Sequence, residues 1–428
     1  MKTLESRWSG SVNPALIKDG QEVFFEEITN SSRKHLSMIS RGEVVALIGD
    51  FDAGSISDMI NLIDKGAILV PLSPLTKEDH QYFFESAGVS WVVSDGESKK
   101  IAESVDNEHL DKLRSQDHAG LVLFSSGTTG RPKAILHDLT LFLKRFSTPR
   151  PTYRTLAFLL FDHIGGINTL LHTLFNKGTV ICTSNREIQN VLKLCRDFEI
   201  EVLPTTPTFL RLMLMSGVIP GEIPETLKVI TYGTERMDEG TLNSLCELLP
   251  EVDFRQTFGM SELGILRVKS KSRDSLFMRI GGEGVEWKVE DELLLIRSDS
   301  RMLGYLNAHS PFDKEGWYQT NDLVQVDGDY IRIMGRNNDV VNVGGLKFLL
   351  SEVERVAYAN PDIALATARA VSNPITGQHV EIIIQPRWAR DLRIESLKKY
   401  FAESLPNHMQ PRRIILDEIA VGHRHKKL

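Results

Sequence analysis

Residues 125–133 have the composition of a phosphate-binding loop. The loop reads Ser-Ser-Gly-Thr-Thr-Gly-Arg-Pro-Lys and follows an apolar run at 120–124 that predicts a buried strand. Its glycines let backbone N–H groups approach a ligand, its hydroxyls add short donors, and Arg131 and Lys133 add positive charge. It is not a Walker A loop, because no Gly-Lys-Ser/Thr tripeptide opens a helix. The composition favours a polyphosphate ligand, with a polar surface loop as the alternative.

The same string closely resembles the phosphate loop of the adenylate-forming superfamily, which includes acyl- and aryl-CoA synthetases, luciferase and peptide-synthetase adenylation domains. The resemblance implies that ATP activates a carboxylate, giving an acyl adenylate and pyrophosphate. It also implies that the loop contacts the nucleotide and that Thr128 takes part in catalysis. The implied nucleotide contacts in the loop are Ser125, Ser126, Gly127, Thr128, Thr129, Gly130 and Lys133.

Two further segments resemble nucleotide-site motifs of the same superfamily. Residues 256–262, Gln-Thr-Phe-Gly-Met-Ser-Glu, resemble "Tyr-Gly-Met-Thr-Glu", with Phe258 and Ser261 in place of the usual Tyr and Thr. The resemblance implies that Glu262 is catalytic and coordinates Mg²⁺, which prefers oxygen ligands. Residues 230–235 resemble the loop along the adenine and the acyl group. Together the two segments contribute the nucleotide contacts Tyr232, Gly233, Thr234, Thr257, Phe258, Gly259 and Ser261.

A ribose site is implied by residues 316–322, Gly-Trp-Tyr-Gln-Thr-Asn-Asp, which resemble "Gly-Trp-Tyr-x-Thr-Gly-Asp". Asp322 would accept hydrogen bonds from two vicinal hydroxyls. Asn321 replaces the usual Gly, and Asn tolerates left-handed backbone angles better than most residues. Arg336 follows in a Gly-Arg pair and is the second ribose contact that the resemblance implies.

An acyl pocket is implied by residues 161–166, Phe-Asp-His-Ile-Gly-Gly, which resemble the "Phe-His-x-x-Gly" segment of acyl-CoA synthetases. His163 would then be catalytic by orienting the substrate carboxylate beside the phosphates. In the alternative register Asp162 would bind an α-amino group, as in peptide-synthetase domains. The candidate pocket residues are medium to large and mostly apolar, which favours a medium acyl or aryl acid over a charged one. They are His163, Ile167, Thr206, Tyr232, Phe258 and Met260.

The C-terminal region resembles the mobile part of the superfamily. Residues 343–354 resemble "Gly-Gly-x-Lys-Val-x-Pro-x-Glu-Val-Glu", with Leu350 in place of Pro. The resemblance implies that this glycine loop swings into the site for the second half-reaction and lines a channel for a thiol arm, with Asn338 at the hinge. The implied channel residues are Gly344, Gly345 and Lys347. A Ser-x-x-Glu pattern at Ser351 predicts a capping box for the helix that follows.

The adenylation lysine of the superfamily lies near the C-terminus. Ungapped alignment from Asp417 places Lys426 at that position, with Lys427 as a one-residue-shift alternative. A basic tail without catalytic function is the other interpretation of these residues.

Strands alternate with helices through the first 230 residues, which predicts mostly parallel sheets with helices on their faces. After residue 281 the pattern changes to strands without intervening helices, which predicts a small β-rich subdomain. We expect an α/β fold with a large N-terminal ATP- and acid-binding domain at 1–337. A small mobile α+β domain at 338–428 would carry the candidate lysine.

Composition narrows the class of protein. The chain has 428 residues, a formal charge of −7 and three widely spaced cysteines. The negative charge argues against a nucleic-acid partner, and the cysteine spacing predicts no metal site. The N-terminus lacks the apolar core of a signal peptide and no apolar run reaches membrane-spanning length, so a cytoplasmic location is expected.

The motifs most closely match acyl- or aryl-CoA ligases. The resemblance therefore implies an ATP-dependent acid–thiol ligase that uses ATP and Mg²⁺ and transfers the acyl group to coenzyme A. The phosphopantetheine of an acyl carrier protein is the alternative acceptor. An alternative of another class is a nucleotide-binding, catalytically silent relative, which the altered C-terminal motif, Asn338 and Leu350 motivate.

Overall fold

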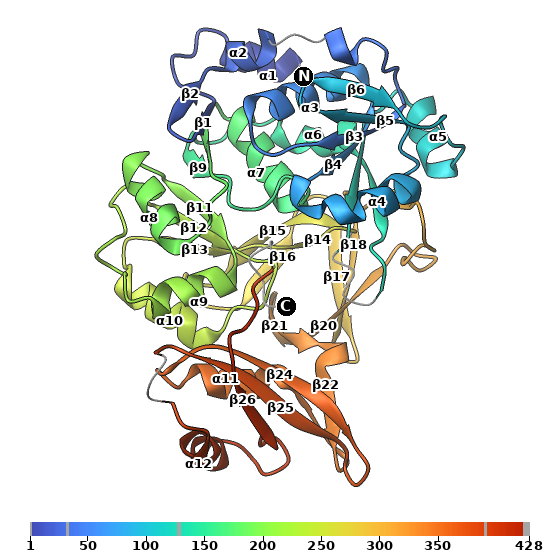
Figure 1. Cartoon of the computed structure of the whole chain (residues 1–428). Helices are drawn as coiled ribbons and strands as arrows, with labels where there is room; N and C mark the ends of the chain where they lie inside the picture. Colours follow the sequence, from blue (N-terminus) through green and yellow to red (C-terminus); the bar gives the residue numbers. More distant parts are fainter. Residues whose placement is uncertain (1, 31–33, 126–129, 389–391, 423–428) are drawn as a thin grey trace.

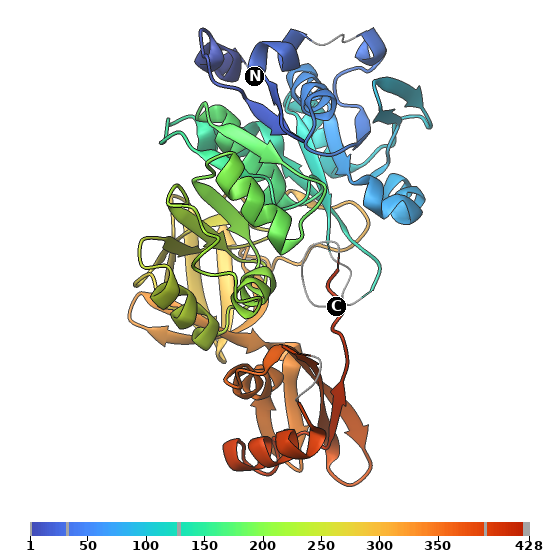
Figure 2. The same ribbon diagram turned by 60° about the vertical axis from the view of Figure 1, so that its left-hand side comes forward.

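The computed structural model describes residues 2–30, 34–125, 130–388 and 392–422, and within them the chain forms four β-sheets flanked by helices. The fold is α/β, as the sequence predicts. Figures 1 and 2 show the N-terminal residues at the top of the molecule and residues 340–416 at the bottom, from which residues 417–422 run back toward the middle. The nucleotide and acyl motifs belong to the strands and loops between these two ends.

The N-terminal sheet has the strand order β19-β8-β7-β4-β3-β5-β6. Strands β7, β4, β3 and β5 run parallel, and β6, β8 and β19 are antiparallel to their neighbours. Strands β4 and β7 are buried at every residue because helices cover both faces of the sheet. The bounds are β3 Val44–Ile48, β4 Ile68–Leu72, β5 Trp91–Ser94, β6 Glu97–Lys100, β7 Gly120–Phe124, β8 Ala134–Asp138 and β19 Gly304–Tyr305.

The central sheet has the order β13-β12-β11-β9-β10-β1-β2 and is parallel apart from β2. Because its strands are parallel, the carboxyl ends of β11, β12 and β13 meet at one edge, where ligands bind in α/β sheets. The bounds are β1 Leu16–Lys18, β2 Gln21–Val23, β9 Arg154–Leu156, β10 Thr179–Cys182, β11 Val202–Thr205, β12 Val229–Tyr232 and β13 Asp253–Gln256.

Helices fill the space between the two parallel sheets and cover their outer faces. One apolar core combines side chains of both sheets with those of α3 (Ala53–Lys65), α6 (Leu139–Leu143) and α7 (Ile164–Phe175). Helices α8 (Ile188–Asp197), α9 (Pro207–Met215) and α10 (Glu239–Leu248) pack on the other face of the central sheet. Helices α4 (His80–Ala87) and α5 (Glu108–Ser115) cover the N-terminal sheet, and α1 (Lys2–Trp8) and α2 (Phe25–Asn30) lie near the N-terminus.

Local signals set the ends of α3, the helix after the first parallel strand. Asp52 Oδ1 accepts a hydrogen bond from Ser55 N at 2.9 Å, and Gly66 ends the helix in the left-handed region at φ 76°. Ile56, Met59, Ile60 and Ile63 face the core, as their spacing predicts. Apolar spacing alone indicates a helix at 55–65, and the observed helix starts two residues earlier.

The third sheet is antiparallel, with the order β14-β15-β16-β21-β20-β18-β17 and a small apolar core of its own. It corresponds to the β-rich segment that the sequence predicts, although it begins earlier, at Phe258. The bounds are β14 Phe258–Met260, β15 Gly264–Ser270, β16 Met278–Gly281, β17 Val285–Glu290, β18 Leu293–Ser298, β20 Tyr318–Asp327 and β21 Tyr330–Arg336.

The C-terminal sheet has the order β23-β22-β25-β24, and β26 pairs with β25. Every residue of its apolar core comes from positions after 340. The short turn η4 (Asn337–Asp339) precedes it, and the division of the chain into domains at 337 and 338 stays a prediction. The bounds are β22 Val340–Val343, β23 Leu346–Leu349, α11 Leu350–Tyr358, β24 Ile363–Asn373, β25 Gly377–Pro386, α12 Ile394–Ser404 and β26 Arg413–Leu416.

The capping box predicted from Ser351 is wrong in its register. Helix α11 begins at Leu350, and Glu352 Oε1 accepts the hydrogen bond from Leu349 N at 3.0 Å. Ser351 Oγ instead donates to the Met334 carbonyl at 3.0 Å, which ties the first turn of α11 to β21. Ser351 therefore makes a tertiary contact, and the local cap comes from Glu352.

Candidate active site

Asp322 and Arg336, the predicted ribose contacts, lie side by side on two neighbouring strands. The register of β20 and β21 places them opposite each other, and Arg336 Nε lies 2.8 Å from Asp322 Oδ1. Asn321 takes the left-handed angle φ 60° that the sequence predicts for the turn. The structure therefore brings these two candidates together.

The carboxylate of this pair is buried while its partner is largely exposed. The side chain of Asp322 is 5% exposed and that of Arg336 is 58% exposed. Burial raises the pKa of Asp322 to about 6, although Arg336 and the Thr320 hydroxyl act against the shift. A buried acceptor of this kind gains from hydroxyl donors supplied by a ligand.

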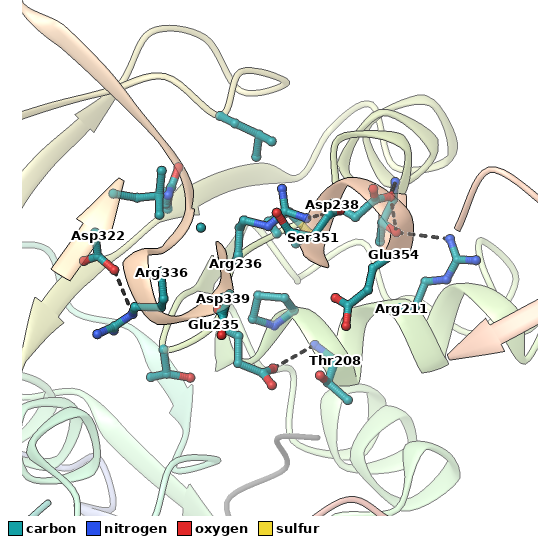
Figure 3. A pocket seen from close by; sticks show the side chains of 18 of the residues that line it. Thr208, Arg211, Glu235, Arg236, Asp238, Asp322, Arg336, Asp339, Ser351 and Glu354 are labelled. Carbon is teal, nitrogen blue, oxygen red and sulfur yellow. Dashed lines mark hydrogen bonds and ion pairs between the residues drawn. The ribbon is translucent and has the colours of Figure 1, made fainter. Parts of the chain in front are cut away.

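A cavity of about 500 Å³ lies beside this pair. Its lining combines residues of the central sheet and α9 with residues of α11 and β24, so residues on both sides of position 337 contribute to it. Figure 3 shows Asp322 and Arg336 on one side and Arg211 and Glu354 on the other. The predicted nucleotide residues that line it are Thr234, Thr257, Phe258, Gly259, Asp322 and Arg336.

The loops after β12 and β13 approach each other closely at this cavity. Thr257 donates from its backbone N to the Tyr232 carbonyl at 2.7 Å and from its hydroxyl to the same oxygen at 3.1 Å. A Cβ at Gly233 would stand 2.7 Å from the Thr257 carbonyl, so the contact requires glycine. The two predicted motifs therefore form one edge of the site.

A second cavity of about 240 Å³ adjoins the first. It lies between α7 and the face of the central sheet that carries Val202 and Val229. His163 caps α7 by accepting a hydrogen bond from Gly165 N at 3.0 Å, and it lines this cavity. The residues that line both cavities are Thr234, Thr257, Phe258 and Gly259.

The predicted acyl-pocket residues divide into two groups. His163 and Phe258 line the second cavity, and Met260 lines the first. The others lie in the apolar cores or cap a helix: Ile167 is 1% exposed, Tyr232 is 1% exposed, and the Thr206 hydroxyl accepts a hydrogen bond from Phe209 N. The alternation of side chains along β12 turns Tyr232 away from the second cavity, which Thr231 lines instead.

Polar residues on one face of α7 line the second cavity and were not predicted from the sequence. Asn168, Thr169, His172 and Thr173 follow the i, i+1, i+4, i+5 spacing of a helix face. A further lining residue, Thr205, is 2% exposed, and its hydroxyl has no hydrogen-bond partner among the described residues. The spacing is visible in the sequence, but a polar face on an apolar helix points to a ligand only once the sheet opposite it is known.

Glu262, the predicted Mg²⁺ ligand, lies near the base of the phosphate loop. Tyr305 Oη donates to Glu262 Oε1 at 2.8 Å, and Lys133 Nζ lies 4.8 Å from the centre of the Tyr305 ring. The base of the loop is closed by Lys133 N donating to Ser125 Oγ and by Ser125 N donating to the Lys133 carbonyl. Burial and the Glu262 carboxylate raise the pKa of Tyr305, which keeps its hydroxyl a donor.

His137 links this loop to the segment of Ser261 and is a residue that sequence reasoning missed. It lies on β8, and its Nε2 is 2.6 Å from the Ser261 carbonyl. Burial lowers the pKa of His137 to about 4, so the ring is neutral and the Nε2 proton is donated to that oxygen. The bond holds the turn before Glu262 against the strand that follows the phosphate loop.

The remaining candidates lie away from the cavities or outside the described residues. Gly344, Gly345 and Lys347 are exposed, and Asn338 is exposed in η4; the cavity linings contain none of these four. The predicted contacts at 126–129 and the lysines Lys426 and Lys427 fall outside the described residues, whereas Gly130 is described, with φ 149°.

Two absences hold for the part of the chain that the structure describes. It contains no group of three or more His, Cys, Asp or Glu side chains placed to hold a metal ion by themselves. None of its helices is long and apolar enough to cross a membrane.

The fold and these motifs define a nucleotide-dependent enzyme, and comparison with known proteins gives the family. Residues 37–306 match the model of the AMP-binding enzyme family, so the chain belongs to that family. A relative, 4-coumarate–CoA ligase-like 6 of Arabidopsis thaliana, is 22% identical over 89% of this chain and 79% of its own length.

Two other proteins illustrate the range of similar sequences and structures. L-proline–[L-prolyl-carrier protein] ligase of Pseudomonas fluorescens is 25% identical over 68% of this chain and 64% of its own length. An o-succinylbenzoate coenzyme A synthetase from Bacillus subtilis, solved with ATP and magnesium ion, has a TM-score of 0.77 and 18% identity. That match covers 99% of this chain and 97% of the solved chain.

Proposed function

We propose that this enzyme is an ATP-dependent carboxylic acid–CoA ligase. The observation that carries the proposal is the shared lining of two cavities by Thr234, Thr257, Phe258 and Gly259. One cavity carries the ribose pair and the other is a slot beneath α7. A nucleotide in the first and an acid in the second would meet at the shared edge.

In the proposed first step a carboxylate oxygen attacks the α-phosphorus of ATP, and the bond to the β-phosphate breaks as pyrophosphate leaves. Asp322 and Arg336 would hold the ribose, while the phosphate loop and Lys133 would hold the phosphates. His163 would orient the carboxylate where the two cavities meet. These groups bring two anions together by fixed donors and positive charge. In the second step a thiol attacks the acyl carbon, and AMP leaves.

Glu262 suits Mg²⁺ as a single oxygen ligand. One of its two oxygens accepts from Tyr305, and Mg²⁺ ordinarily takes one or two carboxylates together with phosphate and water. When bound, the ion would neutralise phosphate charge as pyrophosphate leaves. His137 would support the ligand by fixing the preceding carbonyl, that of Ser261.

The far end of the second cavity favours an acid with a neutral hydrogen-bonding substituent. His172 lies nine residues beyond His163 on α7, which is about 13 Å along the helix. Burial, and to a lesser extent Arg150, lowers the pKa of His172, so the ring is neutral at pH 7. Arg255 also lines this cavity, but it forms an ion pair with Asp253, with 2.6 Å between Nε and Oδ2. We therefore expect a hydroxyl or carbonyl group opposite the reacting carboxylate, rather than a second carboxylate.

The acceptor is proposed to be coenzyme A, with a carrier-protein phosphopantetheine as the alternative. Both present the same thiol arm, and similar sequences carry names of both kinds. The exposed Gly344–Gly345 turn would leave room for that arm once it faces the site.

The proposal is tested by incubating the enzyme with ATP, Mg²⁺ and a panel of aliphatic and aryl acids, with either coenzyme A or a carrier protein. Mass spectrometry should detect acyl-CoA and AMP for at least one acid. Thioester on the carrier protein alone would reject coenzyme A as the acceptor. Absence of acid-dependent AMP formation across the panel would reject the ligase assignment.

A further inference from the structure

Arg211 joins the N-terminal part of the chain to the C-terminal sheet through main-chain oxygens. It lies on α9, and its Nη2 donates to the carbonyls of Ile363 at 2.7 Å and Tyr358 at 3.2 Å. Its Nε donates to the Ala364 carbonyl at 3.2 Å, and its Nη1 donates to the Thr241 hydroxyl at 3.2 Å. Four donated hydrogen bonds therefore fix one guanidinium, and three of them cross between residues on either side of position 337.

The environment of Arg211 makes these bonds difficult to give up. The residue is 6% exposed, and its guanidinium lies 4.8 Å from the centre of the Tyr358 ring. A charged group at such a depth needs its hydrogen bonds satisfied, because an unpaired buried charge is strongly unfavourable. The three carbonyls lie at the end of α11 and the start of β24, so Arg211 on α9 reaches them only where this part of the C-terminal sheet packs on α9.

Two other arginines make the same type of contact along this interface. Arg236 Nη2 donates to the Ser351 carbonyl at 3.2 Å, and Arg387 Nε donates to the Met215 carbonyl at 2.8 Å. Figure 3 shows Arg236 beside Ser351 and Arg211 beside Glu354. Arg211 is the arginine of this group with three acceptors across the interface, which makes it the residue to test.

In the arrangement that the Arg211 hydrogen bonds hold, the predicted thiol-channel residues do not line the nucleotide cavity. Gly344 and Gly345 form the exposed tip between β22 and β23, outside the lining of either cavity. Residues of α11 and β24 line the nucleotide cavity instead. A second arrangement of residues 338–428 is therefore needed before a thiol can pass that glycine turn.

We propose that Arg211 is a positioning residue that holds the C-terminal part over the nucleotide cavity for acyl-adenylate formation and releases it for thiol transfer. The inference rests on the proposed function, because it assigns the observed arrangement to the first of its two steps. Arg211 acts through the position of α11 and β24 rather than on the reacting atoms.

The first test measures the contact itself and needs no activity. Arg211→Met keeps an unbranched apolar stem but removes all the donors of the side chain. Hydrogen–deuterium exchange of the intact chain should become at least several-fold faster in residues 358–366 of this variant. Arg211→Lys, which retains one charge and fewer donors, should show an intermediate change.

The second test separates the two half-reactions. In Arg211→Met the rate of acid-dependent ATP–pyrophosphate exchange should fall about tenfold or more, in line with the loss of a charge-assisted contact. Transfer of the acyl group from supplied acyl adenylate to coenzyme A should be unchanged or faster. A residue with only a structural role would lower both rates together.

Arg273→Met is the matched control. Arg273 also donates to three main-chain carbonyls, those of Cys246, Leu249 and Pro250, but all of them lie in the N-terminal part. Its loss should lower thermal stability without changing the ratio of the two half-reaction rates.

Three outcomes would overturn the proposal. These are unchanged hydrogen exchange at 358–366 in Arg211→Met, a parallel fall of both half-reactions, or the same split in Arg273→Met. Failure of the wild-type chain to make acyl adenylate from any acid would reject the proposed function itself. Hydrogen exchange would still show whether Arg211 holds the two parts together.

Discussion

Asp322 shows at the scale of one residue how burial prepares a carboxylate for a ligand. Its pKa of about 6 means that the folded enzyme binds a proton there more readily than an exposed aspartate does. The ionised form, which accepts ribose hydroxyls, is therefore present above pH 6 and is lost as the pH falls through that value. A bound ribose would replace part of the hydration that burial removes.

We predict that adenosine binding weakens about tenfold between pH 7 and pH 5, because a group with a pKa near 6 is mostly protonated at pH 5. Adenosine is the probe because it has ribose hydroxyls but no phosphate that titrates in this range. Calorimetric titration of wild type and Asp322→Asn measures the effect. Asp322→Asn should bind weakly at both pH values, and a pH dependence that survives in this variant would refute the assignment.

His172 is the residue-scale test of the proposed substrate class. His172→Phe keeps a ring but removes the donor at the far end of the second cavity. For an acid with a terminal hydroxyl, KM should rise about three- to tenfold, the range of one neutral hydrogen bond. For the same acid without the hydroxyl, KM should stay within about twofold of wild type. Equal changes for both acids would show that the ring serves packing alone.

Residue types carried more information for the nucleotide cavity than for the acid cavity. The motif residues Asp322, Arg336, Thr257 and Gly259 line one cavity, and chemistry restricts residue choice at a phosphate or ribose contact. Tyr232 and Ile167 lie in the apolar cores instead, since a large side chain next to a motif fills a core as readily as a pocket. Which face of β12 borders the acid cavity depends on the packing of α7, a contact distant in sequence.

At the scale of elements, the ends of the parallel strands position the site. Gly233 follows β12, Thr257 follows β13, and their backbones are in contact. This arrangement follows from three adjacent parallel strands whose carboxyl ends share one edge. The spacing between the two loops is thus set by the sheet rather than by either motif.

Gly233→Ala should shift the loop after β12, because its Cβ would stand 2.7 Å from the Thr257 carbonyl. We expect adenylation to fall at least tenfold and stability to fall by about 1–3 kcal/mol, the usual cost of overpacking. Pyrophosphate exchange and thermal unfolding measure the two effects. Gly281→Ala is the control, since its Cβ would meet nothing within 4 Å, and it should leave both quantities nearly unchanged.

Strands that are buried on both faces of a sheet were largely predictable from the sequence. The fully buried strands β4 and β7 are apolar runs in the sequence, and β7 has the bounds predicted for it, 120–124. The short half-exposed strands β14 and β17 carry no such run and were not predicted. The cap of α11 was misread because Ser351 bonds β21, and local sequence holds no trace of that contact.

At the scale of the whole molecule, the last residues of the C-terminal part are expected to bring the candidate adenylation lysine to the site. Strand β26 pairs with β25, and Ile419 N donates to Gln385 Oε1 at 3.0 Å. The chain is therefore held against the C-terminal sheet as far as residue 419. We predict that Lys426→Ala lowers pyrophosphate exchange at least a hundredfold while acyl transfer from supplied acyl adenylate is retained. Lys427→Ala is the matched variant and should change exchange less than threefold. Indifference to both substitutions would remove the lysine assignment.

The division at residue 337 was predicted from turn-forming residues and from motif order. It stays a prediction; an apolar core lies wholly after residue 340, and Arg211, Arg236 and Arg387 donate to main-chain carbonyls across position 337. Sequence could not indicate this interface, because main-chain acceptors leave no residue signature. Arg211 lies in an apolar helix without any motif to mark it.

The most direct test of the central claim follows an oxygen atom. A substrate acid labelled with ¹⁸O in its carboxylate is incubated with ATP, Mg²⁺, coenzyme A and the enzyme, and the nucleotide product is weighed by mass spectrometry. If the carboxylate attacks the α-phosphorus, AMP will carry one ¹⁸O atom and pyrophosphate will carry none. Unlabelled AMP, or ADP and phosphate in its place, would contradict acyl-adenylate formation in the joined cavities.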